Sequence, residues 1–91
     1  MRSKDEITKE WIRQSDYDIE TAKHMFKTGR YIYCVFMCHL SMEKILKAHY
    51  HKKLSDVTPK IHNLLYFIEK CALTLPKETF DFIQELNNIS I

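Results

Sequence analysis

Three side chains with complementary chemistry recur at steps of four residues: His39, Glu43 and Lys47. Residues four apart are neighbours on one face of an α-helix, so on a helix the imidazole, carboxylate and ammonium form a row. Most residues around them are apolar, and a charged group there costs desolvation energy unless it is paired or faces a cleft. Lys44 lies beside the row. Two interpretations remain open: an ion-pair ladder within the helix, and a polar cleft for a phosphate-bearing ligand or a facing subunit.

Asp18 adds a carboxylate from an earlier segment. It lies three residues after Ser15 and four before Ala22, on the small-residue side of a predicted helix, where another helix can approach closely. A carboxylate there can pair with Lys44 or Lys47. We therefore predict one polar cleft between the first two helices, in which lysine attracts phosphate as a point charge. Its ligand-binding residues are Asp18, His39, Glu43, Lys44 and Lys47. The alternative is an internal ion-pair network that fixes helix register and binds nothing.

Two histidines are the catalytic candidates, because an imidazole titrates near neutral pH and serves as either acid or base. His39 belongs to the row described above. His62 is expected in the first turn of the third helix, where it would cap the helix, act in catalysis or lie in solvent.

Other cysteine and histidine pairs do not indicate a metal site. Cys34 and Cys38 provide only two thiols on consecutive helical turns, so we interpret them as small buried hydrophobic residues. His49 and His51 diverge by about 200° on a helix. We expect neither a metal nor a cofactor.

The composition indicates which elements position these residues. The 91 residues include one Gly and two Pro, too few turn formers for a sheet, so we predict an all-α fold that is at least 70% helical. A single glycine also excludes the Gly-rich phosphate loops and the G-x-S-x-G nucleophile elbow. The net charge of +2 is too small to indicate nucleic-acid binding by itself.

Apolar residues at steps of three and four predict about four helices. The first begins at Ser3, which has capping-box spacing to Glu6, and stops before Gly29. The second covers about 31–52 and, being apolar on nearly all sides over its first half, is expected to be the most buried. The third begins at Thr58-Pro59, and the fourth begins at Pro76. We expect the whole chain, 1–91, to form one domain in which Trp11 is largely buried.

The apolar runs, the N-terminal residues and the number of cysteines indicate the cellular compartment. The longest apolar run, residues 31–38, is far too short to span a bilayer, and the charged N-terminus lacks a signal-peptide pattern. Three cysteines, an odd number, argue against a disulfide framework. We expect a cytoplasmic protein that does not interact with membranes.

Four motifs in the correct order resemble the HEPN domain family (higher eukaryotes and prokaryotes nucleotide-binding), in its minimal prokaryotic type, over roughly residues 8–90. The motifs are Trp11-x-x-x-Ser15-x-x-Asp18-Ile19-x-x-Ala22, Gly29-x-Tyr31-x-x-Cys34-x-Phe36, Cys38-His39-Leu40-Ser41-Met42-Glu43-Lys44-x-Leu46-Lys47-Ala48 and His62-Asn63-Leu64. The resemblance implies an antiparallel up-and-down bundle of about four helices, often a homodimer, frequently encoded beside a minimal nucleotidyltransferase in a toxin–antitoxin pair. Many members of the family are metal-independent ribonucleases.

The family's ribonuclease signature, an arginine followed four to six residues later by a histidine, is missing. Ten residues separate Arg13 from His24, and eight separate Arg30 from His39. Family members commonly continue with a further helix past the position of Ile91, which leaves two hypotheses. The first is a binding and interaction module with nucleotide affinity that acts with a nucleotidyltransferase. The alternative is a toxin-type ribonuclease whose motif is degenerate or lies beyond these residues.

The amount of apolar surface predicts self-association. Two long half-buried helices and the apolar 31–42 stretch present more apolar surface than two short helices can cover. We therefore expect a homodimer built largely on the first two helices. The family resemblance implies a nucleotide or RNA as its ligand.

Overall fold

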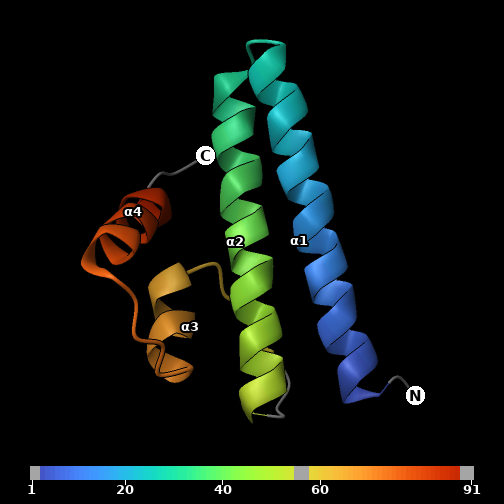
Figure 1. Cartoon of the computed structure of the whole chain (residues 1–91), viewed down its shortest axis with the longest axis vertical. Helices are drawn as coiled ribbons and strands as arrows, with labels where there is room; N and C mark the ends of the chain where they lie inside the picture. Colours follow the sequence, from blue (N-terminus) through green and yellow to red (C-terminus); the bar gives the residue numbers. More distant parts are fainter. Residues whose placement is uncertain (1–2, 55–57, 89–91) are drawn as a thin grey trace.

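The computed structural model describes residues 3–54 and 58–88, and within these ranges the chain forms four helices and no strand, which confirms the all-α prediction (Figure 1). The helices are α1 (Lys4–Lys27), α2 (Tyr31–Leu54), α3 (Leu64–Lys70) and α4 (Lys77–Asn88).

The two long helices form an antiparallel hairpin, and its ends follow the sequence signals. The Ser3 hydroxyl accepts a hydrogen bond from the backbone N–H of Glu6 at 3.1 Å, which caps α1. After α1 the chain turns at Gly29, whose φ of +77° is favourable only for a residue without a side chain.

Two serines face each other where α1 and α2 pack together. The Ser15 hydroxyl lies 2.9 Å from the backbone oxygen of Ser41, and the Ser41 hydroxyl lies 2.9 Å from the backbone oxygen of Ser15. Both residues are buried. Small side chains with satisfied hydroxyls let the two helices approach closely, as the small-residue pattern around Ser15 predicted.

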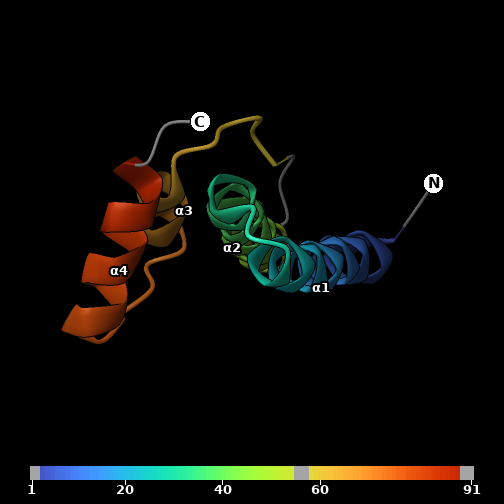
Figure 2. The same cartoon turned by 90° about the horizontal axis from the view of Figure 1, so that it is seen from above.

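The short helices pack on the side of α2 that faces away from α1 (Figure 2). The hydrophobic core therefore lies between the second half of α2, α3 and α4. Phe67 and Leu64 of α3 are fully buried at its centre. The buried members of this core are Leu46, Tyr50, Leu64, Phe67, Ile68, Cys71, Ile83 and Leu86.

The predicted start of the third helix is wrong by several residues. Residues 58–63 are not helical, and α3 begins at Leu64 with Asn63 as its N-cap. The Asn63 carboxamide oxygen accepts hydrogen bonds from two backbone N–H groups, at 3.0 and 3.4 Å. The side chain of Asn87 in α4 accepts the N–H of Leu64 at 2.7 Å. This tertiary contact satisfies the first turn of α3, so the hydroxyl-proline signal at Thr58 is not used. His62 consequently lies just before the helix.

The first half of α2 is less buried than predicted. Tyr31, Ile32 and Tyr33 are 60%, 70% and 54% exposed. In Figure 1 the tip of the hairpin extends beyond α3 and α4, which lie beside the rest of α2. Trp11 is half-buried, less than expected.

Candidate functional site

The first polar group joins α1 to α2. Asp18 Oδ2 and Lys44 Nζ are 2.7 Å apart, with side chains that are 9% and 20% exposed. Their position confirms the expected pairing of Asp18 with a lysine of the second helix.

An open hollow of about 240 Å³ adjoins this pair and is lined by Arg13, Gln14, Tyr17, Asp18 and Lys44. Tyr17 is 70% exposed. The Arg13 guanidinium donates from Nε and Nη2 to the two carboxylate oxygens of Glu10, at 2.8 and 2.6 Å. This contact raises the pKa of Arg13 above its ordinary value, so the hollow keeps a permanent cation at its edge.

The second polar group is centred on Glu43, which is only 4% exposed. Its Oε2 accepts a hydrogen bond from Lys47 Nζ at 3.1 Å. On the other carboxylate oxygen, Oε1, His62 Nδ1 lies at 2.8 Å and His39 Nδ1 at 4.0 Å. The two catalytic candidates therefore meet at one oxygen atom, although they lie in different segments.

Lys47 lies inside the protein. The residue is 6% exposed, and its ammonium nitrogen is 5.5 Å from the centre of the Trp11 ring and 5.8 Å from that of Phe67. The two aromatic faces and the carboxylate offset the desolvation cost of this buried ammonium. Lys47 thus links α1, α2 and α3, and a ligand outside the protein cannot reach it directly.

The two histidines differ in environment. The His62 side chain is 78% exposed although Nδ1 is held by Glu43, which leaves the rest of the ring accessible. His39 is more enclosed, with a side chain that is 16% exposed. Burial lowers the pKa of His39; the Glu43 carboxylate partly opposes this, and His62 adds to the lowering.

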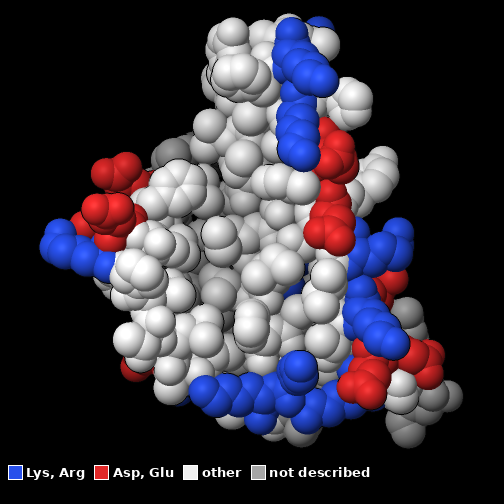
Figure 3. All heavy atoms as spheres, in the orientation of Figure 1, with Lys and Arg blue, Asp and Glu red and all other residues white. Residues whose placement is uncertain are grey.

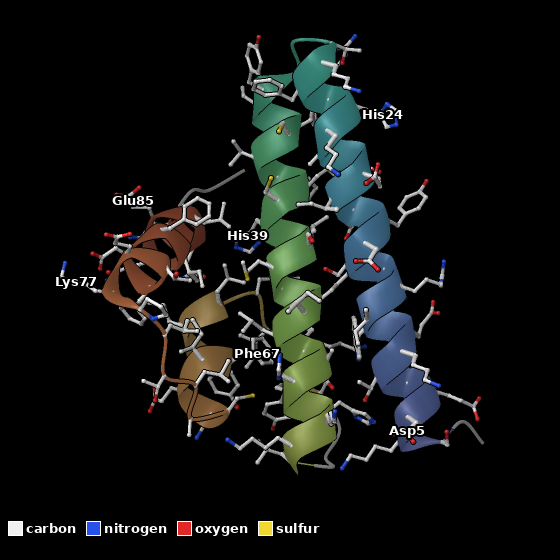
Figure 4. The ribbon with its side chains drawn as sticks, in the orientation of Figure 1. Asp5, His24, His39, Phe67, Lys77 and Glu85 are labelled. Atoms are coloured by element: carbon white, nitrogen blue, oxygen red, sulfur yellow. The ribbon has the colours of Figure 1, made fainter. Side chains whose placement is uncertain are left out.

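The five predicted ligand-binding residues thus divide between two sides of α2. Figure 4 shows His39 on the side of α2 that faces α3 and α4. Glu43 belongs with His39 through their 4.0 Å contact, whereas Asp18 of α1 pairs with Lys44 of α2. No hydrogen bond or ion pair joins the two groups within 3–54 and 58–88. The role of all five in ligand binding remains a prediction.

The sequence analysis missed several residues of these sites. Arg13 and Tyr17 are four apart on α1, so the i, i+4 rule that selected His39 and Glu43 also applied to them. Asn87 hydrogen-bonds Asn63 at 3.1 Å from 24 positions away, and no local pattern could have predicted that contact.

Neither metals nor membranes are indicated by the described residues. In that part of the chain no three His, Cys, Asp or Glu side chains are grouped so that they could hold a metal ion. No helix there is both long enough and apolar enough to cross a bilayer.

The sequence model of the HEPN domain matches residues 8–91, and the chain therefore belongs to the HEPN domain family. Searches of curated proteins and of solved structures each gave no match. Membership of this family supports a nucleotide- or RNA-related module.

Proposed function

We propose that this HEPN domain is a nucleotide-binding module whose ligand occupies the hollow beside Asp18 and Lys44. The observation that carries the proposal is that two cations and an exposed tyrosine ring line one open hollow of about 240 Å³. A mononucleotide presents the complementary groups, an anionic phosphate and a flat base.

Donor capacity supports a phosphate at this position. Lys44 Nζ forms an ion pair with Asp18 Oδ2 at 2.7 Å, and its ammonium carries three donors that can serve phosphate oxygens. A guanidinium has five donors, of which Arg13 uses two on Glu10. The Tyr17 ring is available for stacking with the base, a contact that tolerates any base.

The remaining candidates have supporting roles in this proposal. Asp18 positions the Lys44 ammonium. The buried Glu43 and Lys47 hold α2 against its neighbours, so they act on the ligand site through helix position.

Isothermal titration with mono- and dinucleotides tests the proposal. We expect the wild type to bind and Lys44→Ala to bind at least roughly tenfold more weakly, since a charge-assisted contact to phosphate is lost. Lys77→Ala is the matched control, because this lysine also pairs with an aspartate, at 2.8 Å, but lies on α4. A wild-type protein that binds no nucleotide refutes the proposal. A Lys44→Ala variant that binds like the wild type refutes the location.

We propose two partners for the module. The first is a second copy of the chain, in contact through the hairpin tip, where Tyr31, Ile32 and Tyr33 are each more than half exposed. The second, carried by the family resemblance, is a minimal nucleotidyltransferase. Sedimentation of the wild type and of Ile32→Asp tests the first. We expect a dimer and a monomer respectively, and a wild-type monomer at high micromolar concentration contradicts it.

A second candidate function, toxin-type metal-independent cleavage of RNA, is favoured by the meeting of His39 and His62 at Glu43 Oε1. When His62 Nδ1 carries a proton and donates it in a hydrogen bond to Glu43, the unprotonated Nε2 can take the proton of a ribose 2′-hydroxyl. The 2′-oxygen then attacks phosphorus, and the departing 5′-oxygen receives a proton from protonated His39. The products are a 2′,3′-cyclic phosphate and a 5′-hydroxyl.

Cleavage of a fluorogenic RNA in the presence of a chelator tests this second candidate. The low pKa of His39 predicts greater activity below the ordinary histidine pKa, because only the protonated ring is an acid. We expect His62→Gln to abolish cleavage, and expression of the wild type alone to arrest bacterial growth. No cleavage by the wild type at any pH rejects the ribonuclease and leaves the binding module.

A further inference from the structure

Two hollows lie along the seam of the α1–α2 hairpin, and we call them together the hairpin groove. The one nearer the N-terminus has a volume of about 140 Å³ and is lined by Thr8, Ile12, Ile45, Ala48, His49 and Lys52. The one nearer the tip has a volume of about 390 Å³, and its lining includes Ile19, Lys23, Phe26, Lys27, Cys34 and Cys38.

Helical spacing shows that both hollows open on the same side of the hairpin. On α1 the lining residues Thr8, Ile12, Ile19, Lys23 and Phe26 follow one another at steps of four, seven, four and three. Steps of three, four and seven keep residues on one helix face. On α2 the steps are again four, seven, four and three, through Cys34, Cys38, Ile45, His49 and Lys52.

The floor of the groove is apolar and accessible. Ile12, Ile19 and Phe26 repeat at intervals of seven along α1 and are 41%, 37% and 62% exposed. Cys34 and Cys38 are half-buried, so they are not the interior hydrophobic residues that the sequence suggested. At a rise of 1.5 Å per residue, the stretch from Thr8 to Phe26 is about 27 Å long, enough for a helix of about five turns.

The rim of the groove is cationic. Lys23, Lys27 and Lys52 line the two hollows, and no acidic residue lines either of them. Lys23 also pairs with Glu20 at 3.0 Å, on the surface of α1.

The rest of the described fold leaves the groove open. Among the four helices α1 packs against α2 alone, and α3 and α4 lie beyond α2 on its other side (Figure 2). The space-filling view also shows basic side chains along the hairpin near its tip (Figure 3).

We propose that the hairpin groove binds an amphipathic helix of a partner protein, one whose apolar stripe is flanked by acidic residues. An apolar stripe at the intervals of a helix fits apolar residues at intervals of seven, and carboxylates on its flanks meet the lysine rim. This site shares no lining residue with the hollow proposed for nucleotides.

The charges favour this occupant over two others. A second copy of the same groove would bring lysines against lysines, which is repulsive in a symmetric contact. A nucleic acid would satisfy the lysines but would cover exposed isoleucines with phosphate, which leaves the apolar floor without a matching surface.

The experiment uses two synthetic three-heptad peptides with leucine at a and d, one with glutamate and one with lysine at e and g. Each is titrated into the 15N-labelled protein below the concentration at which the peptide self-associates. We expect the glutamate peptide to shift the amide signals of Ile12, Ile19 and Ile45. The lysine peptide should bind roughly tenfold more weakly or not at all.

Variants locate the site. Ile19→Glu should abolish binding of the glutamate peptide, and Phe82→Glu is its control, because Phe82 is 57% exposed on α4. Lys27→Glu, a change at an exposed position, should weaken binding of the glutamate peptide and strengthen binding of the lysine peptide. Nucleotide binding should be unchanged in both groove variants, which separates this proposal from the proposed function.

Several outcomes overturn the proposal. They are no shift of the amide signals with either peptide, equal affinity for the two peptides, or an equal loss of affinity for the glutamate peptide in Ile19→Glu and Phe82→Glu. A wild-type dimer that Ile19→Glu dissociates also overturns it, because the groove would then hold a second copy. A single-stranded RNA that shifts the groove amides more strongly than the glutamate peptide assigns the groove to nucleic acid instead.

Discussion

The first half of α2, residues 31–42, is much richer in apolar residues than the second half, residues 43–54, and yet it is the more exposed of the two. In the second half Leu46 is 3% exposed and belongs to the hydrophobic core that α2 shares with α3 and α4. In the first half Ile32 is 70% exposed, at the tip of the hairpin. The difference shows that apolar residues on a helix are buried only where another element covers them. It also separates the module into a stable base, formed by the second half of α2 with α3 and α4, and an accessible hairpin tip. The following changes test that separation.

The largest expected effect is in the base. Phe67→Ala removes a fully buried ring and should lower the free energy of unfolding by about 3–5 kcal/mol. Ile32→Ala at the tip should change it by less than about 0.5 kcal/mol in the monomer. Urea unfolding at low protein concentration measures both, and equal losses would show that the tip is packed after all.

Breaking the interior ion pair ranks second. Lys47→Ala leaves the Glu43 carboxylate buried without its ammonium partner and should cost about 3 kcal/mol. The double variant Glu43→Gln/Lys47→Met should recover part of this loss, because no uncompensated charge remains. Thermal unfolding of the single and double variants measures the difference. A single variant as stable as the wild type would mean that water already reaches the pair.

The contact between α3 and α4 is expected to contribute less. Asn87→Ala removes the acceptor of the Leu64 N–H and a donor to Asn63, and should cost about 1–2 kcal/mol. Asn88→Ala is the control, since Asn88 is exposed on the same helix. Urea unfolding distinguishes them, and equal stability of the two variants would remove Asn87 from the packing of the base.

The smallest effect concerns pH. Burial lowers the pKa of His39, so below its ordinary value of 6.5 the unfolded chain binds a proton that the folded chain resists. The contribution of His39 to stability is therefore complete above about pH 6.5 and is lost as the pH falls toward the folded-state pKa. The melting temperature of the wild type should fall more steeply between pH 7 and 5 than that of His39→Gln. Parallel curves would show that His39 is protonated without cost.

Local signals in the sequence were sufficient for most of the helices. The Ser3 cap, the turn at Gly29 and the start of α4 after Pro76 are where the residues predict them, because each depends on neighbours within one or two turns. The start of α3 was mispredicted, because it depends on Asn87, which is distant in the sequence.

In the candidate site, too, local spacing predicted some contacts, and contacts between distant residues decided the others. The i, i+4 spacing of Glu43 and Lys47 correctly predicted their contact on one helix face. That spacing carries no information on which side of α2 faces α1. The sequence therefore placed Glu43 and Lys44 in one cleft, whereas one meets His62 and the other meets Asp18.

By itself, the sequence determined the all-α class, the ends of most helices and the family, because helix formation and motif order depend on residue types at short spacing. Only the tertiary structure decided which surface of each helix is covered. It directed α3 and α4 to one side of the base and left the tip and the hairpin groove open. The physical reason is that burial and ion pairing between helices depend on contacts among distant residues, and these exist only once the helices have packed.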